Sequence, residues 1–152
     1  MIKESHIGSK LSEYNRIMKE NDEVYRDLAK TLGLSESVFW ILYALRAEDA
    51  AVQSEICACM HQPKQTVNSA LKKMDADGYI ELTCGGNRRS KRIILTEKGD
   101  ALCKRTVDKV IAIESAALNE MPEEELELFL SLFRKYTALL KERRVGLQQN
   151  YK

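Results

Sequence analysis

The sequence lacks several features on which other classes of protein depend. No apolar run approaches the roughly 20 residues of a membrane-spanning helix, and the first residues lack the apolar core of a secretion signal. Only two prolines and seven glycines interrupt the 152 residues, which favours long helices. We therefore expect a helix-rich cytoplasmic protein with a single domain, residues 1–152, whose four cysteines are reduced thiols.

Enzyme motifs and metal-binding motifs are also missing. The sequence has no phosphate loop and no nucleophile elbow. His6 and His61 have no metal-ligand spacing with the cysteines. Cys57 and Cys59 would point about 200° apart around a helix, too far to hold one ion. We expect neither an enzyme nor a bound metal or cofactor.

Net charge is low, but it is unevenly distributed. The chain has 24 Lys and Arg against 23 Asp and Glu, a formal net charge of +1, which by itself argues against a nucleic-acid partner. Residues 62–98, however, hold eight basic and four acidic side chains, whereas the remainder carries −3. Four of the basic residues lie between Gly85 and Arg92 with no acid among them. Such a concentration is typical of phosphate binding, although a solvated hairpin tip has the same composition.

Spacings of three and four between apolar residues predict a largely helical chain. Gly33 and Gly78 suit the ends of the first and fourth helices, and Ser35 suits the N-cap of the second. Pro63 suits the first turn of the fourth helix, and Thr96 the cap of the fifth. We expect helices over 10–32, 35–46, 52–60, 63–76 and 96–118, and a last one from Pro122 onward.

The pattern changes to alternation between the fourth and fifth predicted helices. Residues 79–83 alternate apolar with polar side chains, residues 92–95 do so less cleanly, and a Gly-Gly pair with basic residues separates the two runs. Two such runs around a glycine turn predict a β-hairpin. The order of elements predicts a mainly α fold with a small β-hairpin wing, a winged helix-turn-helix flanked by long helices.

The predicted helix over 63–76 has two unlike faces. Its apolar face comprises Val67, Ala70, Leu71 and Met74. The opposite face offers groups that suit base edges and phosphates in a major groove, which admits an α-helix. These residues are Lys64, Gln65, Thr66, Asn68, Ser69 and Lys72. An ordinary solvated helix has the same composition, and the basic hairpin beside it favours DNA.

Two segments, PKQTVNSALKKMDADGYIEL and NRRSKRIILTEKG, resemble the recognition helix and wing of the MarR family of bacterial transcriptional regulators. The resemblance covers nearly the whole chain. It implies a homodimeric repressor that binds a palindromic operator in double-stranded DNA and is released by a small aromatic or phenolic effector. The family's wing arginine falls on Arg89, but Asn87 stands where an acid is usual. Gln62 stands where a Ser or Thr N-cap would strengthen the recognition helix.

The resemblance also divides the chain by role. Residues 35–97 would form the DNA-binding lobe, and residues 1–32 and 98–147 the helical dimerisation region. The residues expected to contact DNA are Lys64, Gln65, Thr66, Asn68, Ser69, Lys72, Arg88, Arg89 and Lys91.

Two further sets of residues complete the expected sites. The last helix has more large apolar residues than its own lobe can cover, so a partner surface is expected. The predicted dimer interface comprises Leu11, Leu126, Phe129, Phe133, Tyr136 and Leu140. The predicted effector crevice is lined by Tyr14, Met18, Trp40 and Tyr43, although an aromatic stripe at helical spacing also fits a core.

Two other functions remain open at this stage. One is a thiol-based redox-responsive regulator, for which Cys84 near the basic hairpin tip is the candidate, because arginines lower the pKa of a nearby thiol. Relatives that sense peroxide use a cysteine on the first helix, and this chain has none before Cys57. The other is a helical protein-interaction adaptor that keeps a winged-helix lobe but binds protein.

Overall fold

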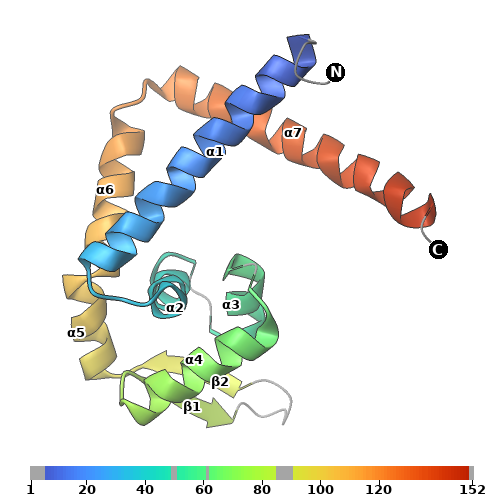
Figure 1. The fold of residues 1–152 in the computed structure, drawn as a ribbon. Helices are drawn as coiled ribbons and strands as arrows, with labels where there is room; N and C mark the ends of the chain where they lie inside the picture. The colour runs from blue at the N-terminus through green and yellow to red at the C-terminus, as the bar shows by residue number, and fades with distance from the viewer. Residues whose placement is uncertain (1–5, 49–50, 61, 85–90, 151–152) are drawn as a thin grey trace. The chain divides into compact units, whose positions relative to one another are not determined.

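The computed structural model describes the chain except residues 1–5, 49–50, 61, 85–90 and 151–152 (Figure 1). In the described residues the fold class is confirmed as mainly helical with one two-stranded hairpin. The elements are α1 (His6–Thr31), α2 (Glu36–Ala47), α3 (Gln53–Met60), α4 (Lys64–Ala76), β1 (Ile80–Cys84), β2 (Lys91–Leu95), α5 (Glu97–Arg105), α6 (Val107–Asn119) and α7 (Glu123–Asn150). They divide into two compact units, residues 1–111 and 112–152.

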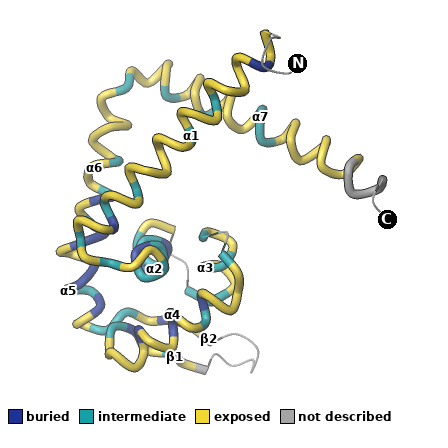
Figure 2. Tube along the Cα trace, viewed as in Figure 1, coloured by how far each residue is buried: buried dark blue, intermediate teal, exposed yellow. Residues whose placement is uncertain are grey.

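Helix α2, whose sequence is apolar on nearly all sides, is the centre of the first unit. Phe39, Ile41 and Leu42 are fully buried, and α2 packs against α1, α3, α4 and α5 (Figures 1 and 2). Its N-cap is Ser35, whose hydroxyl accepts a hydrogen bond from the backbone N–H of Val38 at 3.4 Å. A helix that is apolar on most sides is stable only when other elements surround it, and here four helices do so.

Two helices end as their glycines predicted. Gly33 has φ +68°, and Gly78 has φ +75°. After α4, the N–H of Gly78 donates to the carbonyl of Asp75, and that of Tyr79 to the carbonyl of Met74, both at 2.9 Å. This pair of bonds is the Schellman motif, whose left-handed residue is most easily glycine. The same motif closes α1.

The hairpin has the predicted position, with β1 and β2 paired antiparallel from Ile80 opposite Leu95 to Cys84 opposite Lys91. The predicted third helix, however, starts one residue too early. Val52 instead forms a bridge to Arg92 of β2, and the N–H of Ile93 donates to the carbonyl of Ala51. The backbone before α3 is therefore held to the edge of the sheet, which periodicity alone does not show.

The single long helix predicted over 96–118 is wrong, because the chain breaks at Thr106 between α5 and α6. Thr106 is buried, and its hydroxyl donates to the carbonyl of Leu102 at 2.6 Å. A threonine that bonds to the carbonyl four residues earlier competes with helix geometry. Thr106 has φ −127° and ψ −94°, outside the helical region.

The second unit contains the end of α6 and the 28-residue α7, which has three glutamates in its first turn. No residue of α7 whose exposure the structure describes is buried. Its exposed apolar side chains are Leu128, Phe129, Leu132, Phe133, Leu139, Leu140 and Val145. Phe129 and Phe133 stack with ring centroids 6.1 Å apart.

In the part of the chain that the structure describes, no single helix is long and apolar enough to span a membrane. Helices α1 and α2 meet the length and composition criteria only together, as a pair bent by 99°.

Candidate nucleic-acid interface

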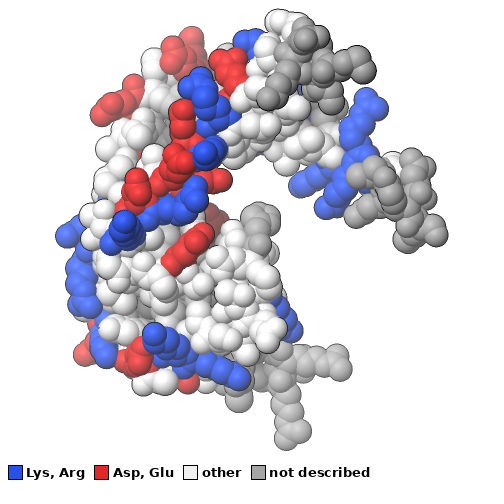
Figure 3. Space-filling model, viewed as in Figure 1, with Lys and Arg blue, Asp and Glu red and all other residues white. Residues whose placement is uncertain are grey.

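Helix α4 presents the two faces that its sequence predicted. Val67, Leu71 and Met74 are buried, and Ala70 is half-buried against the core. Among the predicted contact residues, Asn68 is half-buried, and Lys64, Gln65, Thr66, Ser69 and Lys72 are exposed. Figure 3 shows basic side chains gathered over α4. One helix therefore offers amide, hydroxyl and ammonium groups along one side while its other side is fixed in the core.

The start of α4 differs from the prediction. Pro63 is the N-cap itself, with φ −57° and ψ 137°, rather than a residue of the first turn, and no side chain caps this end. Two other contacts hold the turn before α4. The amide of Gln53 on α3 donates to the carbonyl of Lys64, and the hydroxyl of Ser37 on α2 to the side-chain carbonyl of Gln62, each at 3.4 Å.

The end of α4 is held by a contact network of which the sequence predicted one part, Thr96 as the cap of α5. The hydroxyl of Thr96 donates to the carbonyl of Gly78 at 2.7 Å and accepts from the N–H of Gly99 at 3.1 Å. The ammonium of Lys98 donates to the carbonyl of Asp77 at 2.6 Å and lies 4.4 Å from the ring centre of Tyr79. The motif LTEKG thus joins the start of α5 to the turn between α4 and the hairpin. Its resemblance to a family motif was noticed in the sequence, but its other contacts were not.

The hairpin tip can be described only at its two ends. Arg88 and Arg89, both predicted to contact DNA, lie outside the described residues. Lys91 is the first residue of β2, but nothing is described of its side chain. Arg92 follows it and is exposed.

An ion-pair network joins α2 to the two sides of the break at Thr106. The guanidinium of Arg46 contacts both carboxylate oxygens of Asp108 at 2.8 and 2.9 Å and one of Asp100 at 2.8 Å. Hydrogen bonds to these carboxylates raise the pKa of Arg46. Lys104 pairs with Asp100 at 2.7 Å, and its contact, with that of Arg46, lowers the pKa of Asp100. Arg46 and Asp108 are 62 residues apart, so no local pattern could have revealed the pair.

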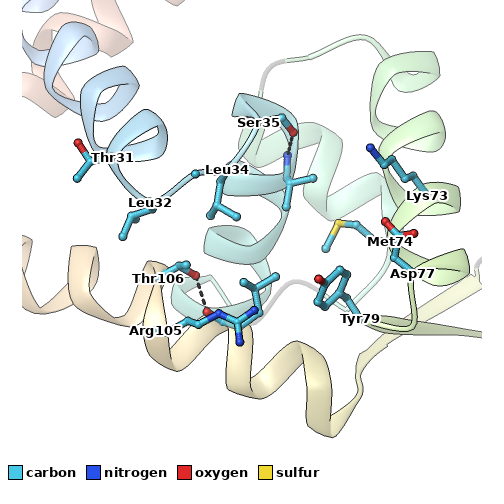
Figure 4. A pocket seen from close by; sticks show the side chains of 13 residues that line it. Thr31, Leu32, Leu34, Ser35, Lys73, Met74, Asp77, Tyr79, Arg105 and Thr106 are labelled. Atoms are coloured by element: carbon cyan, nitrogen blue, oxygen red, sulfur yellow. Dashed lines mark hydrogen bonds between the residues drawn. The ribbon is translucent and has the colours of Figure 1, made fainter.

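Three cavities in the first unit are large enough for a small molecule, since ligand pockets commonly enclose about 300–1,000 Å³. The largest, about 570 Å³, has an apolar wall that includes Leu34 and Met74, with Arg105 and Lys73 among its polar residues (Figure 4). A second, of about 560 Å³, adjoins Arg46, Asp100 and Lys104.

The third cavity, of about 530 Å³, lies against α1, α2 and α3. Of the predicted effector residues, Trp40 lines it, whereas Tyr14, Met18 and Tyr43 line none of these three cavities. All four side chains are half-buried. The four-residue crevice stays a prediction.

Two of the cysteines whose side chains are described, Cys59 and Cys103, have thiol pKa values that are raised. Cys103 is fully buried, and burial is the main cause that raises its pKa to about 11. Partial burial, with the carboxylates of Glu48 and Glu55, raises the pKa of Cys59. Cys84 ends β1, but its side chain lies outside the described residues, so the redox prediction is untested. The described residues contain no cluster of three potential metal ligands.

Sequence comparisons find one family model and a curated transcriptional regulator that resemble this chain. The family model described as MarR family matches residues 32–90. An HTH-type transcriptional regulator of Bacillus subtilis, YwoH, is 27% identical over 104 residues, 68% of this chain and 76% of that protein.

Solved structures share the fold. A MarR family regulator from Neisseria meningitidis, NMB1585, has a TM-score of 0.76 at 22% identity, covering 93% of this chain and 98% of that one. The MepR–DNA complex of S. aureus has a TM-score of 0.61 at 21% identity, covering 86% and 97%. At these identities the likeness concerns the fold alone.

Proposed function

We propose that this chain is a MarR-family DNA-binding transcriptional regulator, since the model of that family matches residues 32–90, and that it is a homodimeric repressor whose α4 enters the major groove of a palindromic operator. The observation that carries the proposal is the α4 face, where Gln65 and Lys72 are exposed opposite a wholly buried side. A solved relative, MepR, was crystallised with DNA. The relatives are regulators rather than enzymes.

Dimerisation is supported by the exposed apolar face of α7. Phe129, Phe133 and Leu140 are 51%, 43% and 51% exposed, and Leu11 of α1 is 44% exposed. Leu126 and Tyr136, also predicted at the interface, are half-buried. Large apolar side chains exposed together on one helix mark association surfaces, and two-fold pairing places two recognition helices on one duplex.

The proposed function assigns distinct roles to residues of α4. Gln65 and Asn68 carry amides suited to base edges, whereas Lys64 and Lys72 carry charges suited to phosphates. Arg88, Arg89 and Lys91 would add phosphate and minor-groove contacts. The protein would act in the cytoplasm and respond to a small aromatic effector.

Selection of bound sequences from a random DNA pool tests this function. We expect a near-palindrome to be enriched, with half-sites about one helical turn apart. Gln65→Ala should change the preferred sequence, whereas Lys72→Ala should weaken binding to all sequences about tenfold and reduce the salt dependence. Lys109→Ala, an exposed lysine outside α4, is the control. If no sequence is enriched and partner proteins bind independently of salt, the adaptor function replaces this one.

A further inference from the structure

The cavity at Trp40 is built from three helices. Its walls come from α1 (Asn21, Asp22, Tyr25 and Arg26), α2 (Glu36 and Trp40) and the end of α3 (Cys59 and Met60). It encloses about 530 Å³, enough for a small organic molecule. The side chains of these walls determine whether the cavity favours a positively or a negatively charged molecule.

The cavity has an aromatic wall. The rings of Tyr25 and Trp40 have centroids 5.2 Å apart and are tilted by 42° to each other. Both side chains are half-buried, so part of each remains accessible. The face of an aromatic ring carries partial negative charge and attracts organic cations, most strongly in tryptophan.

The remaining walls of the cavity carry a net negative charge, the same sign as the partial charge on the faces of the rings. Asp22 and Glu36 are both exposed acids, and Arg26 is the one basic residue among those that line the cavity. The guanidinium of Arg26 is turned to its own helix, where its Nε donates to the backbone carbonyl of Asp22 at 3.4 Å. The formal charge of the lining side chains is therefore −1.

Two further carboxylates lie near Cys59. Desolvation is the main cause that raises the pKa of this thiol, and the carboxylates of Glu48 and Glu55, neither of which lines the cavity, add to it. Negative charge disfavours a thiolate in the same way that it disfavours any other anion. The walls and their surroundings therefore favour a bound cation and oppose a bound acid.

We propose that this cavity binds an aromatic organic cation, such as a quaternary ammonium compound, between the Tyr25–Trp40 rings and the carboxylates of Asp22 and Glu36. The inference deepens the proposed function, on which its regulatory part rests, because it assigns the charge of the effector. Among aromatic effectors, these walls favour a cation over an acid.

The position of the cavity links an occupant to α4. Cys59 and Met60 are the last two residues of α3, and α3 packs against α4 and is tied to it by the bond from Gln53 to Lys64. A ligand that displaces the end of α3 therefore moves the start of the helix proposed to read DNA.

Trp40 is the only tryptophan in the chain, so its fluorescence reports the cavity directly. Titration of the full-length protein with benzyltrimethylammonium should change Trp40 fluorescence saturably, whereas phenylacetate should not. Relative to free tryptophan, caesium ions should quench Trp40 more strongly and iodide more weakly. Asp22→Asn and Glu36→Gln should each raise the Kd for the cation about threefold or more, and the double variant should remove the preference for caesium.

The matched control is Asp27→Asn, an exposed acid on α1 that does not line the cavity. It should leave the Kd unchanged, and circular dichroism should show that all the variants keep the parent's helix content. Absence of saturable binding, equal binding of phenylacetate, or a Kd that is the same in the double variant and the parent would each overturn the proposal.

A second measurement separates this inference from the proposed function. The cation should weaken binding to the operator selected from the random pool, and the double variant should resist it. If Trp40 responds to the cation but no operator is ever selected, the cavity assignment stands and the repressor function fails. If an operator is selected and Trp40 shows no response, the cavity assignment fails alone.

Discussion

Gly99 shows how a single residue can fix the junction between the hairpin and α5. A Cβ at this position would clash with the backbone carbonyl oxygen of Tyr79 and would touch the side chain of Leu95. Its N–H donates to the hydroxyl of Thr96. The glycine is required here for close approach and not for backbone conformation, because its φ is not in the left-handed region.

We therefore expect Gly99→Ala to lower the free energy of unfolding by about 1–3 kcal/mol, the usual range for overpacking. Urea denaturation followed by circular dichroism measures it. Gly146→Ala is the matched control, since a Cβ there meets nothing within 4 Å in the exposed helix α7. That change should be neutral or stabilising by about 0.5–1 kcal/mol. Equal effects of the two substitutions would contradict the packing argument.

At the level of elements, the ion pairs of Arg46 hold α2, α5 and α6 together across the break at Thr106. Asp100 lies on α5 and Asp108 on α6, so one guanidinium holds both sides of the break. The side chain of Arg46 is 27% exposed, which weakens each ion pair relative to a buried one.

Arg46→Gln should lower the free energy of unfolding at neutral pH by about 1 kcal/mol. The pKa of Asp100 is lowered in the folded protein, so its ion pairs stabilise the fold above the ordinary carboxyl pKa of about 4 and lose that effect as the pH falls through the folded value. The difference between Arg46→Gln and the parent should therefore shrink in acid. Thermal melts across this pH range measure it.

Arg105→Gln is the control for Arg46, because Arg105 is exposed and forms no ion pair with the residues that the structure describes. It should shift the melting temperature little at any pH. A difference between Arg46→Gln and the parent that persists unchanged in acid would mean that packing of the arginine stem, rather than charge, holds the break.

For the whole molecule, the proposed function depends most on the proposed dimer, because two recognition helices must bind one operator. Substitution of both Phe129 and Phe133 by Glu places charge on the apolar face of α7 and should convert the proposed dimer into a monomer. Analytical ultracentrifugation measures the mass. Glu127→Gln on the same helix is the control and should remain dimeric. A parent protein that is monomeric at every concentration would refute the dimer.

Much of the fold could be predicted from single segments of the sequence. Ser35 capping α2, Gly33 and Gly78 ending their helices, and the hairpin around the Gly-Gly pair follow from preferences that act over a few residues. The prediction of the apolar face of α4 is correct for the same reason, since the spacing of Val67, Leu71 and Met74 alone fixes which side is buried.

The failures have one physical origin. Val52 leaves the predicted helix because β2 offers its backbone a partner, and Thr106 breaks another because its buried hydroxyl bonds to the helix carbonyl. Neither partner is visible in a local pattern. The effector crevice stays a prediction: Trp40 lines one of the three cavities, and helical spacing gives a face of a helix but not which faces meet around an empty space.

The sequence by itself determined the fold class, the order of the helices and strands, and the concentration of positive charge over residues 62–98. These properties depend on composition and on neighbours along the chain. Only the tertiary structure decided how LTEKG holds the end of α4, which acids Arg46 joins, and that the cavity at Trp40 is lined by two carboxylates. Those properties arise from residues distant in sequence that folding brings together, and a pair interaction exists only once both partners are in place.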